Sequence, residues 1–443
     1  MKIISAKVTD LRVPTSDNML GSDPFHKAPD YSSAVLHLET DGGLRGVSVV
    51  FTVGAGTDWI GHGIKDLATL VVGSTLEEFC EAPVKLYRRL NDHHQLRWLH
   101  DGVFRMACGA IINAMWDLWA KAEKKPLWKL LVDLEPKFVV DCIDWRNLKD
   151  ALTPEEALKI LDKAGETKAA REDAMSELGP KAYCTAGWLG LSDEAILATV
   201  RKLQEEGFDA FKVKVGLNSS EDVARIKFMR EAIGNDQSLM VDANQFWGVG
   251  EAKEHVANYG PFGLKWVEEP IARDDVLGYL ELSESFKKES FQFACGEHAA
   301  SPVIFKQLLK SGAVGYCQID AVRVSGVNDV MAIILMAAKF GVPVCPHGGG
   351  IALCNMIQHY GMWDQIAVSG HSKTQLVEYI DFLQDAVEQP VRMKDGHYLA
   401  PEAPGWGLEF REEFLRDHTF PGGKIWSSRP KEKCGVHFEF ETD

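Results

Sequence analysis

Two neighbouring stretches, FKVKVG (Phe211–Gly216) and LMVDAN (Leu239–Asn244), decide the fold and hold much of the chemistry. In the first stretch, apolar and basic residues alternate with the period of two that is typical of a β-strand. Lys212 and Lys214 therefore project from the same face of the strand, which we expect to be buried. Two buried ammonium groups need partners, and Asp242 near the end of the second stretch supplies a carboxylate.

The same arrangement, an apolar run that ends in polar residues, recurs along the second half of the chain. WVEEP (Trp266–Pro270) repeats it, and helix starts such as Ser301-Pro302 separate the runs. The predicted strands are 183–189, 210–215, 239–241, 264–267, 291–294, 316–319, 343–344 and 365–368. Seven or eight strand–helix units of this kind predict an α/β barrel. An open doubly wound sheet is the alternative, but no GxGxxG motif follows a strand to support a dinucleotide site.

The N-terminal part of the chain has a different pattern. Strands are predicted at 3–13, 34–39 and 47–53. The last two are joined by Asp41-Gly42-Gly43, which is a good hairpin signal. The polar stretch Thr15–Tyr31 is a predicted loop, which we expect to close over the barrel mouth. Helical periodicity is clearest over Val103–Ala122.

These patterns predict three parts of the chain. Residues 1–135 form an α+β domain, and residues 136–385 form the barrel. Within the barrel part, the charged and Ala-rich stretch near 153–180 is a helical insertion that starts with the capping signal Thr153-Pro154-Glu155-Glu156. Residues 386–443 form a C-terminal segment.

The composition limits the class of protein. With 443 residues, of which 46% are hydrophobic, the chain can form a large core. Its formal net charge of -16 excludes the basic surface expected of a nucleic-acid-binding protein. Nine cysteines without CxxC pairs indicate reduced thiols, and the longest apolar run, 330–338, is about half of a membrane span. We therefore expect a cytoplasmic protein with neither nucleic-acid nor membrane partners.

Six polar residues lie at or just after successive predicted strands, at the spacing of one strand–helix unit. They are Lys214, Asp242, Glu268, Glu297, Asp320 and His347, with gaps of 28, 26, 29, 23 and 27 residues by subtraction of their positions. In a barrel all six meet at the C-terminal mouth, where barrel enzymes do their chemistry. Asp242, Glu268 and Glu297 would share a small volume, so they need a positive partner, and oxygen ligands favour a hard divalent ion such as Mg2+. Lys214 and His347 then flank the ion as two candidate acid/base groups.

Six motifs at this spacing, KVK, VDAN, WVEEP, GEH, QID and PHGGG, resemble the enolase superfamily, specifically its acid-sugar dehydratases. The resemblance covers nearly the whole chain. Four further motifs are most similar to the L-fuconate dehydratases: PTS (Pro14–Ser16), DYS (Asp30–Ser32), QLRW (Gln95–Trp98) and FKQLL (Phe305–Leu309). The family implies a modified TIM barrel of the (β/α)7β type, an N-terminal capping domain against which the C-terminal segment packs, and a homo-oligomer with one Mg2+ per subunit.

The resemblance also implies a role for each matching residue. These roles are metal ligands for Asp242, Glu268 and Glu297, the base for Lys214, the acid for His347, its orienting partner for Asp320, and further site residues for Lys212 and Glu378. Glu269 lies beside a ligand but is expected to point elsewhere.

Four other residues are candidates for contact with the substrate. They are Asn244, His298, Tyr31 and Trp98. For the two aromatic residues, packing at the domain interface is the alternative. Three departures from the family pattern are Phe246, Gly349 and Asn355. We expect them to lie beside the substrate, so the sugar acid can differ from L-fuconate.

The implied reaction converts a sugar acid, L-fuconate or a related aldonate, to its 2-keto-3-deoxy acid. Lys214 removes the C2 proton, His347 protonates the departing C3 hydroxyl, and Mg2+ stabilises the charge that develops. Three alternatives remain: a dehydratase for another acid sugar such as L-galactonate or D-arabinonate, a racemase or cycloisomerase on the same site, and a barrel that only binds its ligand. No ligand or base is missing, which disfavours the last of these.

Overall fold

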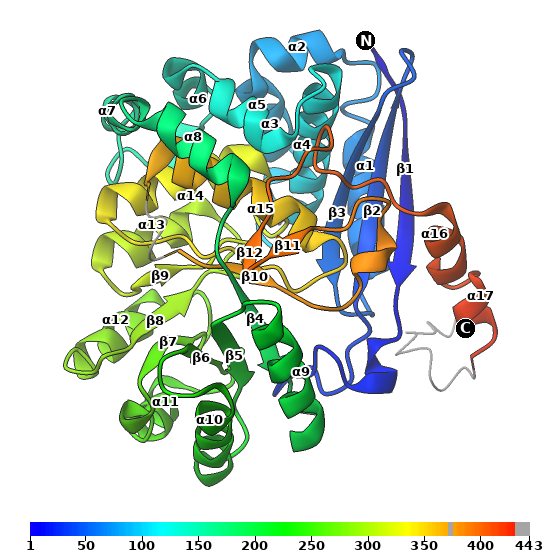
Figure 1. The fold of residues 1–443 in the computed structure, drawn as a ribbon. Helices are drawn as coiled ribbons and strands as arrows, with labels where there is room; N and C mark the ends of the chain where they lie inside the picture. Colours follow the sequence, from blue (N-terminus) through cyan, green and yellow to red (C-terminus); the bar gives the residue numbers. More distant parts are fainter. Residues whose placement is uncertain (371–374, 430–443) are drawn as a thin grey trace.

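A computed structural model describes residues 1–370 and 375–429 of the chain. The N-terminal residues form a three-stranded antiparallel sheet in the order β1-β2-β3, with helices packed against it (Figure 1). Its strands are β1 (Ile3–Arg12), β2 (Ser32–Thr40) and β3 (Arg45–Thr52), and its helices are α1 (Thr57–Ala68), α2 (Leu76–Glu81), α3 (Pro83–Asn91), α4 (Val103–Ala122), α5 (Leu127–Asp133) and α6 (Pro136–Asp141). The predicted strands and the long helix are confirmed.

The second part of the chain is a parallel barrel. Seven strands pair in the order β10-β4-β5-β6-β7-β8-β9. They are β4 (Ala182–Gly187), β5 (Ala210–Lys214), β6 (Ser238–Asp242), β7 (Leu264–Glu268), β8 (Gln292–Cys295), β9 (Tyr316–Cys317) and β10 (Val377–Tyr379). Residues 343–347 close the gap between β9 and β10, because Cys345 N donates to Cys317 O at 2.8 Å and Glu378 N donates to Pro346 O at 3.1 Å. The barrel therefore has eight strand positions.

A helix follows each strand position except the last. These helices are α9 (Asp193–Glu205), α10 (Ser219–Ile233), α11 (Val249–Val256), α12 (Val276–Ser285), α13 (Pro302–Ser311), α14 (Val327–Phe340) and α15 (Leu353–Trp363). This is the (β/α)7β arrangement that the family resemblance implies. Two more helices, α7 (Pro154–Gly165) and α8 (Lys168–Glu177), precede β4. The start of α7 is the predicted capping box, in which Thr153 and Glu156 exchange side-chain and backbone hydrogen bonds.

One predicted strand is wrong. Residues 365–368 belong to a buried π-helical turn, Asp364–Val368, that extends α15. A short apolar run has no periodicity that separates a buried strand from a buried helix, so the pattern could not decide between them. The eighth strand is instead β10, which carries Glu378.

Helix α4 fixes the N-terminal part above the barrel. Asn113 Nδ2 donates to Ala321 O at 2.9 Å, and Trp116 Nε1 donates to Asn328 Oδ1 at 3.0 Å. Gly109 permits this close approach, because a Cβ at that position would lie 2.3 Å from Val324 O. The segment after β9 therefore contacts both the barrel and α4, which places β2, β3 and the loop between β1 and β2 at the barrel mouth.

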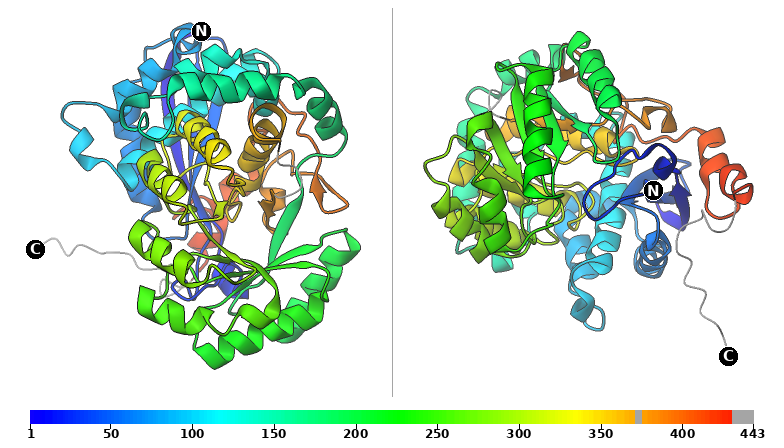
Figure 2. Two further views of the ribbon diagram at one scale, coloured as in Figure 1. Left: turned by 90° about the vertical axis from the view of Figure 1, so that its left-hand side faces the viewer. Right: turned by 90° about the horizontal axis from the view of Figure 1, so that it is seen from below.

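The chain after β10 returns to the N-terminal sheet. Helices α16 (Glu412–His418) and α17 (Lys424–Ser427) lie beside β1, as the two views in Figure 2 also show. Phe420 N donates to Asp10 O at 2.9 Å, and Trp426 Nε1 donates to Arg12 O at 2.9 Å. Residues 430–443 of the predicted C-terminal segment lie outside the described residues. Within the described ranges, no helix is long and apolar enough to cross a membrane.

Candidate active site

The strand period of two arranges the inside of the barrel in layers. The lower layer, here termed the apolar floor, consists of Tyr183, Ala210, Met240, Trp266, Ala294, Cys345 and Leu376. Two positions further along the same strand positions come the buried polar residues Thr185, Lys212, Asp242, Glu268, His347 and Glu378. Residues two apart in a strand point to the same face. An apolar residue followed two positions later by a polar one, repeated in successive strands, therefore places a charged layer on the apolar floor.

Lys212 is held among three carboxylates in the charged layer. Its Nζ donates to Glu268 Oε1 at 2.7 Å and lies 3.0 Å from Glu378 Oε1 and 3.5 Å from Asp242 Oδ2. Burial alone would lower the pKa of Lys212, but the Glu268 and Glu378 carboxylates outweigh it and hold that pKa well above its ordinary value. Lys212 is therefore a fixed positive charge, in keeping with the buried pairing expected from the sequence.

Asp242, Glu268 and Glu297 form a candidate metal centre. Each is buried and offers one carboxylate oxygen, and these three atoms lie within 4.8 Å of one another. Burial raises the pKa of Glu268, and the nearby Asp242 charge raises it further, although Lys212 opposes the shift. The cluster is thus short of positive charge. Its all-oxygen donor set fits a hard divalent cation.

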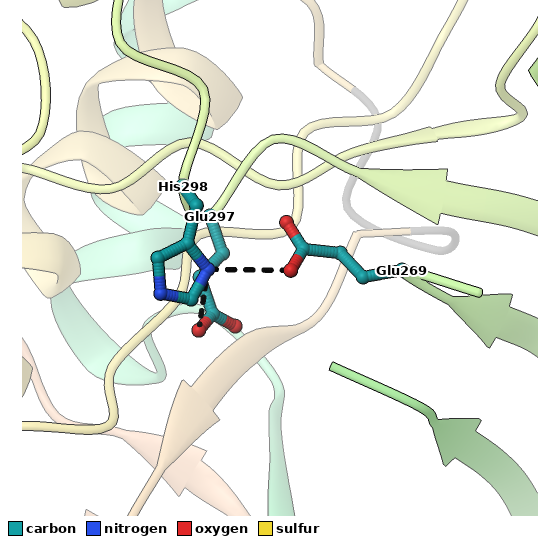
Figure 3. Close-up of side chains that lie close together, drawn as sticks. All are labelled: Glu269, Glu297 and His298. Carbon is teal, nitrogen blue, oxygen red and sulfur yellow. Dashed lines mark hydrogen bonds and ion pairs between the residues drawn. The ribbon is translucent and has the colours of Figure 1, made fainter. Parts of the chain in front are cut away.

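Glu269 points toward His298, which lies between it and Glu297 of that centre (Figure 3). His298 Nδ1 lies 3.2 Å from Glu269 Oε2 and 3.3 Å from Glu297 Oε1. Gln245 Nε2 also donates to Glu269 Oε2, at 2.8 Å. The backbone of Glu269 has a φ of 37°, and this left-handed conformation accompanies the change of direction between the two consecutive glutamates. Glu269, Glu297 and His298 are also close enough to hold a metal. Burial would lower the pKa of His298, but the Glu297 and Glu269 carboxylates outweigh it and raise that pKa, so the imidazole is itself a partner for both carboxylates.

Lys214 contacts the other edge of the carboxylate cluster. Its Nζ donates to Asp242 Oδ2 at 2.6 Å and to Asn244 Oδ1 at 2.9 Å. Burial would lower the pKa of Lys214, but the Asp242 carboxylate outweighs it and raises the pKa, while the neighbouring Lys212 charge works in the opposite direction. Asn244 has a left-handed backbone with φ of 45°, and this conformation places its amide beside the ammonium group.

His347 is held by Asp320, as the sequence predicts. His347 Nδ1 donates to Asp320 Oδ2 at 2.8 Å, and His347 Nε2 lies 3.6 Å from Glu297 Oε2 and 3.7 Å from Glu378 Oε2. Burial would lower the pKa of His347, but the Glu297 carboxylate and the hydrogen bond to Asp320 raise it to about 9. The imidazole is therefore protonated near neutral pH, which suits a group that donates a proton.

A cavity of about 420 Å³ opens onto these groups. Three of the four predicted substrate contacts, Tyr31, Asn244 and His298, line it. Trp98 does not. Its side chain is 78% exposed in the short turn Arg97–Leu99, so it neither lines the cavity nor packs in an interface between the domains. The sequence pattern gave no burial signal for this turn, and a substrate contact of Trp98 stays a prediction that this cavity does not support.

The loop of residues 15–31, termed the 15–31 loop, supplies one wall of the cavity. Gly21, Asp23, His26 and Tyr31 line the cavity from this loop. Asp23 Oδ2 lies 2.9 Å from His26 Nδ1 and organises the turn between them. Gly21 has a φ of 80°, and a Cβ there would lie 2.2 Å from the Tyr31 ring, so this position requires glycine. The loop thus borders the cavity, while its closing motion stays a prediction.

The three departures from the family pattern have different surroundings. Gly349 lines the cavity. Phe246 is 38% exposed, and its ring packs edge-on against Phe25 of the 15–31 loop at 5.4 Å. Asn355 is buried in α15 and donates from Nδ2 to Gln389 O at 3.0 Å. The expectation that all three lie beside the substrate is therefore wrong for Phe246 and Asn355, because neither lines the cavity.

Several residues of the site are not among those that the sequence predicts. Thr185 Oγ1 donates to Glu378 Oε1 at 3.0 Å, and Trp266 Nε1 donates to Glu268 Oε2 at 2.9 Å. The period of two could have found Trp266, which shares a strand face with Glu268. Arg323 also lines the cavity, and its Nη1 donates to Phe51 O at 2.7 Å. Arg323 lies beyond the strand-end position that Asp320 occupies, so the spacing did not mark it.

Comparison with known proteins identifies the family. The Enolase C-terminal domain-like family model matches residues 195–414, and the Mandelate racemase / muconate lactonizing enzyme N-terminal domain model matches residues 15–132. The chain is 42% identical to mitochondrial enolase superfamily member 1 of Xenopus laevis over 437 residues, which cover 98% of each chain. It is 39% identical to L-galactonate dehydratase of Hypocrea jecorina over 421 residues, which cover 94% of this chain and 93% of that protein.

A solved structure gives the same answer. The crystal structure of human mitochondrial enolase superfamily member 1 superposes with a TM-score of 0.94 at 40% identity, and the match covers 96% of this chain and 98% of that one. Two domain models, full-length relatives and this superposition agree with a barrel preceded by an N-terminal domain. The chain therefore belongs to the enolase superfamily, with a mandelate racemase / muconate lactonizing enzyme N-terminal domain followed by an enolase-like C-terminal domain.

Proposed function

We propose that this protein is a Mg2+-dependent hydro-lyase that converts a sugar acid to its 2-keto-3-deoxy acid. One observation supports this function above all: the candidate base and the candidate acid contact different members of one carboxylate cluster. Lys214 Nζ lies 2.6 Å from Asp242 Oδ2, and His347 Nε2 lies 3.6 Å from Glu297 Oε2. A substrate seated on the cluster would therefore have a proton acceptor and a proton donor within reach.

Each residue of the site has a task in this proposal. Asp242, Glu268 and Glu297 hold the cation. When bound there, Mg2+ supplies positive charge that acidifies the carbon next to the substrate carboxylate and opposes the charge on Lys214. Lys214 accepts the C2 proton at Nζ, and His347 donates a proton from Nε2 to the departing C3 hydroxyl.

The remaining polar residues orient the reacting groups. Asp320 holds His347 Nδ1, so the other ring nitrogen faces the cavity. Lys212 and Glu378 lie 3.0 Å apart and both line the cavity, where the substrate carboxylate would bind. Tyr31, Asn244 and His298 line the rest and would contact the hydroxyl groups of the sugar.

The sugar acid itself is the finer part of the proposal. L-fuconate is the first candidate, because the four N-terminal and barrel motifs quoted above resemble the enzymes that act on it. L-galactonate is the second candidate, and the relative from Hypocrea jecorina that bears this substrate in its name supports it. D-arabinonate is a third. A dehydratase is favoured over a racemase because two relatives, L-galactonate dehydratase of Hypocrea jecorina and L-talarate/galactarate dehydratase of Salmonella typhimurium, are dehydratases by name.

The test is a screen of five- and six-carbon acid sugars with the purified protein and Mg2+, in which semicarbazide detects the keto-acid product. Product from one or a few sugars, lost on removal of Mg2+ with a chelator, is the expected result. Epimerised or ring-opened substrate without keto acid would indicate a racemase or cycloisomerase. Binding of an acid sugar without any conversion would indicate a protein that only binds its ligand.

We also propose that the protein is a cytoplasmic homo-oligomer whose chain divides at about residues 135 and 385. Light scattering on the purified protein would give its mass in solution, and cell fractionation would give its location. Limited proteolysis would locate the divisions. A monomer, a membrane or organelle fraction, or cleavage at other positions would each contradict the corresponding part.

A further inference from the structure

Trp266 lies directly below the candidate metal centre. It is fully buried in the apolar floor, where its ring contacts the Tyr183 ring edge-on at 5.3 Å and the Tyr316 ring at 4.9 Å. Its indole nitrogen links this layer to the charged layer, because Nε1 donates to Glu268 Oε2 at 2.9 Å. Nothing in the proposed reaction uses this residue.

The hydrogen bond completes the set of donors around Glu268. Lys212 Nζ donates to Oε1 at 2.7 Å, and Trp266 Nε1 donates to Oε2 at 2.9 Å. Two donors on two oxygens fix both the position and the plane of the carboxylate. Each oxygen keeps a second lone pair, so the carboxylate remains able to bind a cation.

Few other hydrogen-bond donors can replace Trp266 at the buried Glu268 carboxylate. Glu268 and Trp266 are both fully buried, so water does not replace a missing partner at low cost. The strand also explains the pairing, because Trp266 and Glu268 are two residues apart in β7 and share its inner face. The indole is rigid and packed on two sides, so it holds the Glu268 carboxylate in place more precisely than a flexible side chain would.

We propose that Trp266 is a positioning residue of the metal centre: its indole N–H orients the Glu268 carboxylate for cation binding. The inference rests on the proposed function, since it takes Glu268 as a metal ligand. It assigns Trp266 no contact with the substrate. Partners that orient metal ligands typically contribute about 10- to 100-fold to metal affinity.

The experiment measures Mg2+ binding by calorimetry in the wild type and in Trp266→Phe, which removes the N–H and part of the ring. The matched control is Trp363→Phe. Trp363 is 1% exposed, and its Nε1 has no hydrogen-bond partner among the described residues, so this variant has a similar packing loss without a polar one. We expect about 10- to 100-fold weaker Mg2+ binding in Trp266→Phe and wild-type affinity in Trp363→Phe.

A second variant keeps the test valid if Trp266→Phe does not fold. 3-Benzothienylalanine placed at position 266 has the shape of tryptophan but sulfur in place of the N–H, and we expect the same loss of Mg2+ affinity. Folded variants that bind Mg2+ as the wild type does would overturn this inference alone. A wild-type protein that binds no Mg2+ would overturn the proposed metal centre, and the inference with it.

Discussion

Gly349 lines the cavity directly beside His347. A Cβ at position 349 would lie 2.8 Å from His347 Nε2, which is closer than nonbonded contacts allow. We predict that Gly349→Ala displaces the imidazole and lowers kcat by about 10- to 100-fold, because a catalytic group misplaced by about 1 Å can cost that much. Steady-state kinetics with the best acid sugar, together with Mg2+ calorimetry, measures the effect.

The control for this variant is Gly250→Ala. A Cβ at Gly250, in α11, meets no atom within 4 Å, so the substitution adds the same methyl group without a clash. Mg2+ affinity should be unchanged in both variants. A Gly349→Ala protein with wild-type kcat would show that His347 has room to move without loss of function.

The two consecutive glutamates give a second prediction. Glu268→Gln removes one of the three charged oxygen ligands and should abolish turnover and weaken Mg2+ binding severely. Glu269→Gln should retain most of the Mg2+ affinity, because Glu269 contacts Gln245 and His298 and not the cluster. Calorimetry on the two variants checks the assignment. Loss of binding in Glu269→Gln with normal binding in Glu268→Gln would move the metal to the group that contains His298.

At the residue scale, the spacing of the strand ends predicted much of the site. It did not predict the direction in which a side chain points. Four site residues could be placed because each lies at the end of a predicted strand, one or more strand–helix units from the next: Lys214, Asp242, Glu268 and His347. The direction of Glu269 could not be derived from a strand period, since its φ of 37° lies outside the strand conformation. Loop residues have no period at all.

At the scale of elements, the 15–31 loop contacts the barrel segments that follow β4 and β6. Phe25 is 58% exposed and packs edge-on against Phe246, while Ser22 Oγ accepts from Gly190 N at 2.9 Å. We predict that Phe25→Ala raises KM by roughly 2- to 10-fold and leaves Mg2+ affinity unchanged, because an aromatic pair of this kind contributes about 0.5–1.5 kcal/mol. Kinetics over several acid sugars measures the change.

Leu277→Ala is the control for the loop variant. Leu277 is 78% exposed on α12, so its removal takes away exposed apolar surface outside the loop. It should leave KM at the wild-type value. An unchanged KM and an unchanged substrate profile in Phe25→Ala would contradict a role for the loop in substrate binding.

Strands and helices were predictable wherever the period of the sequence and the length of the segment agreed. The run 210–215 alternates and became β5, and Val103–Ala122 repeats at three and four and became α4. In the run 365–368, Gln365 is followed by three apolar residues without alternation, so the environment decided its conformation, and it packs as a π-helical turn after α15. The closing strand β10 has three residues, which is too short to carry a period.

At the scale of the whole molecule, His359 of α15 joins three parts of the chain. Trp128 N of α5 donates to His359 Nδ1 at 3.0 Å, and His359 Nε2 donates to Trp406 O of the C-terminal segment at 3.4 Å. Burial lowers the pKa of His359 to about 3, although the hydrogen bond to Trp406 O opposes the shift. The imidazole is therefore neutral in the folded protein.

The sign of the resulting pH dependence follows from proton binding. Below the ordinary pKa of about 6.5, the unfolded chain protonates His359 while the folded protein does not, so the free energy of unfolding decreases as the pH is lowered. We predict that His359 contributes about 2–3 kcal/mol of this loss between pH 7 and pH 4.5. Chemical denaturation across this range, compared between the wild type and His359→Gln, isolates the contribution.

The exposed His62 on α1 provides the control, because His62→Gln should keep the wild-type pH dependence of unfolding. The His359→Gln protein should lose less stability in acid than the wild type. If the free energy of unfolding had the same slope against pH in His359→Gln and in the wild type, His359 would not be held neutral in the folded protein.

The division of work between Lys214 and His347 is the central claim, and deuterium exchange tests it most directly. In deuterated water with Mg2+ and the best acid sugar, proton NMR follows both the C2 hydrogen and the keto-acid product. His347→Asn should exchange the C2 hydrogen but form product roughly 10²- to 10⁴-fold more slowly, and Lys214→Ala should do neither. Exchange that survives in Lys214→Ala but vanishes in His347→Asn would contradict the account and reverse the two roles.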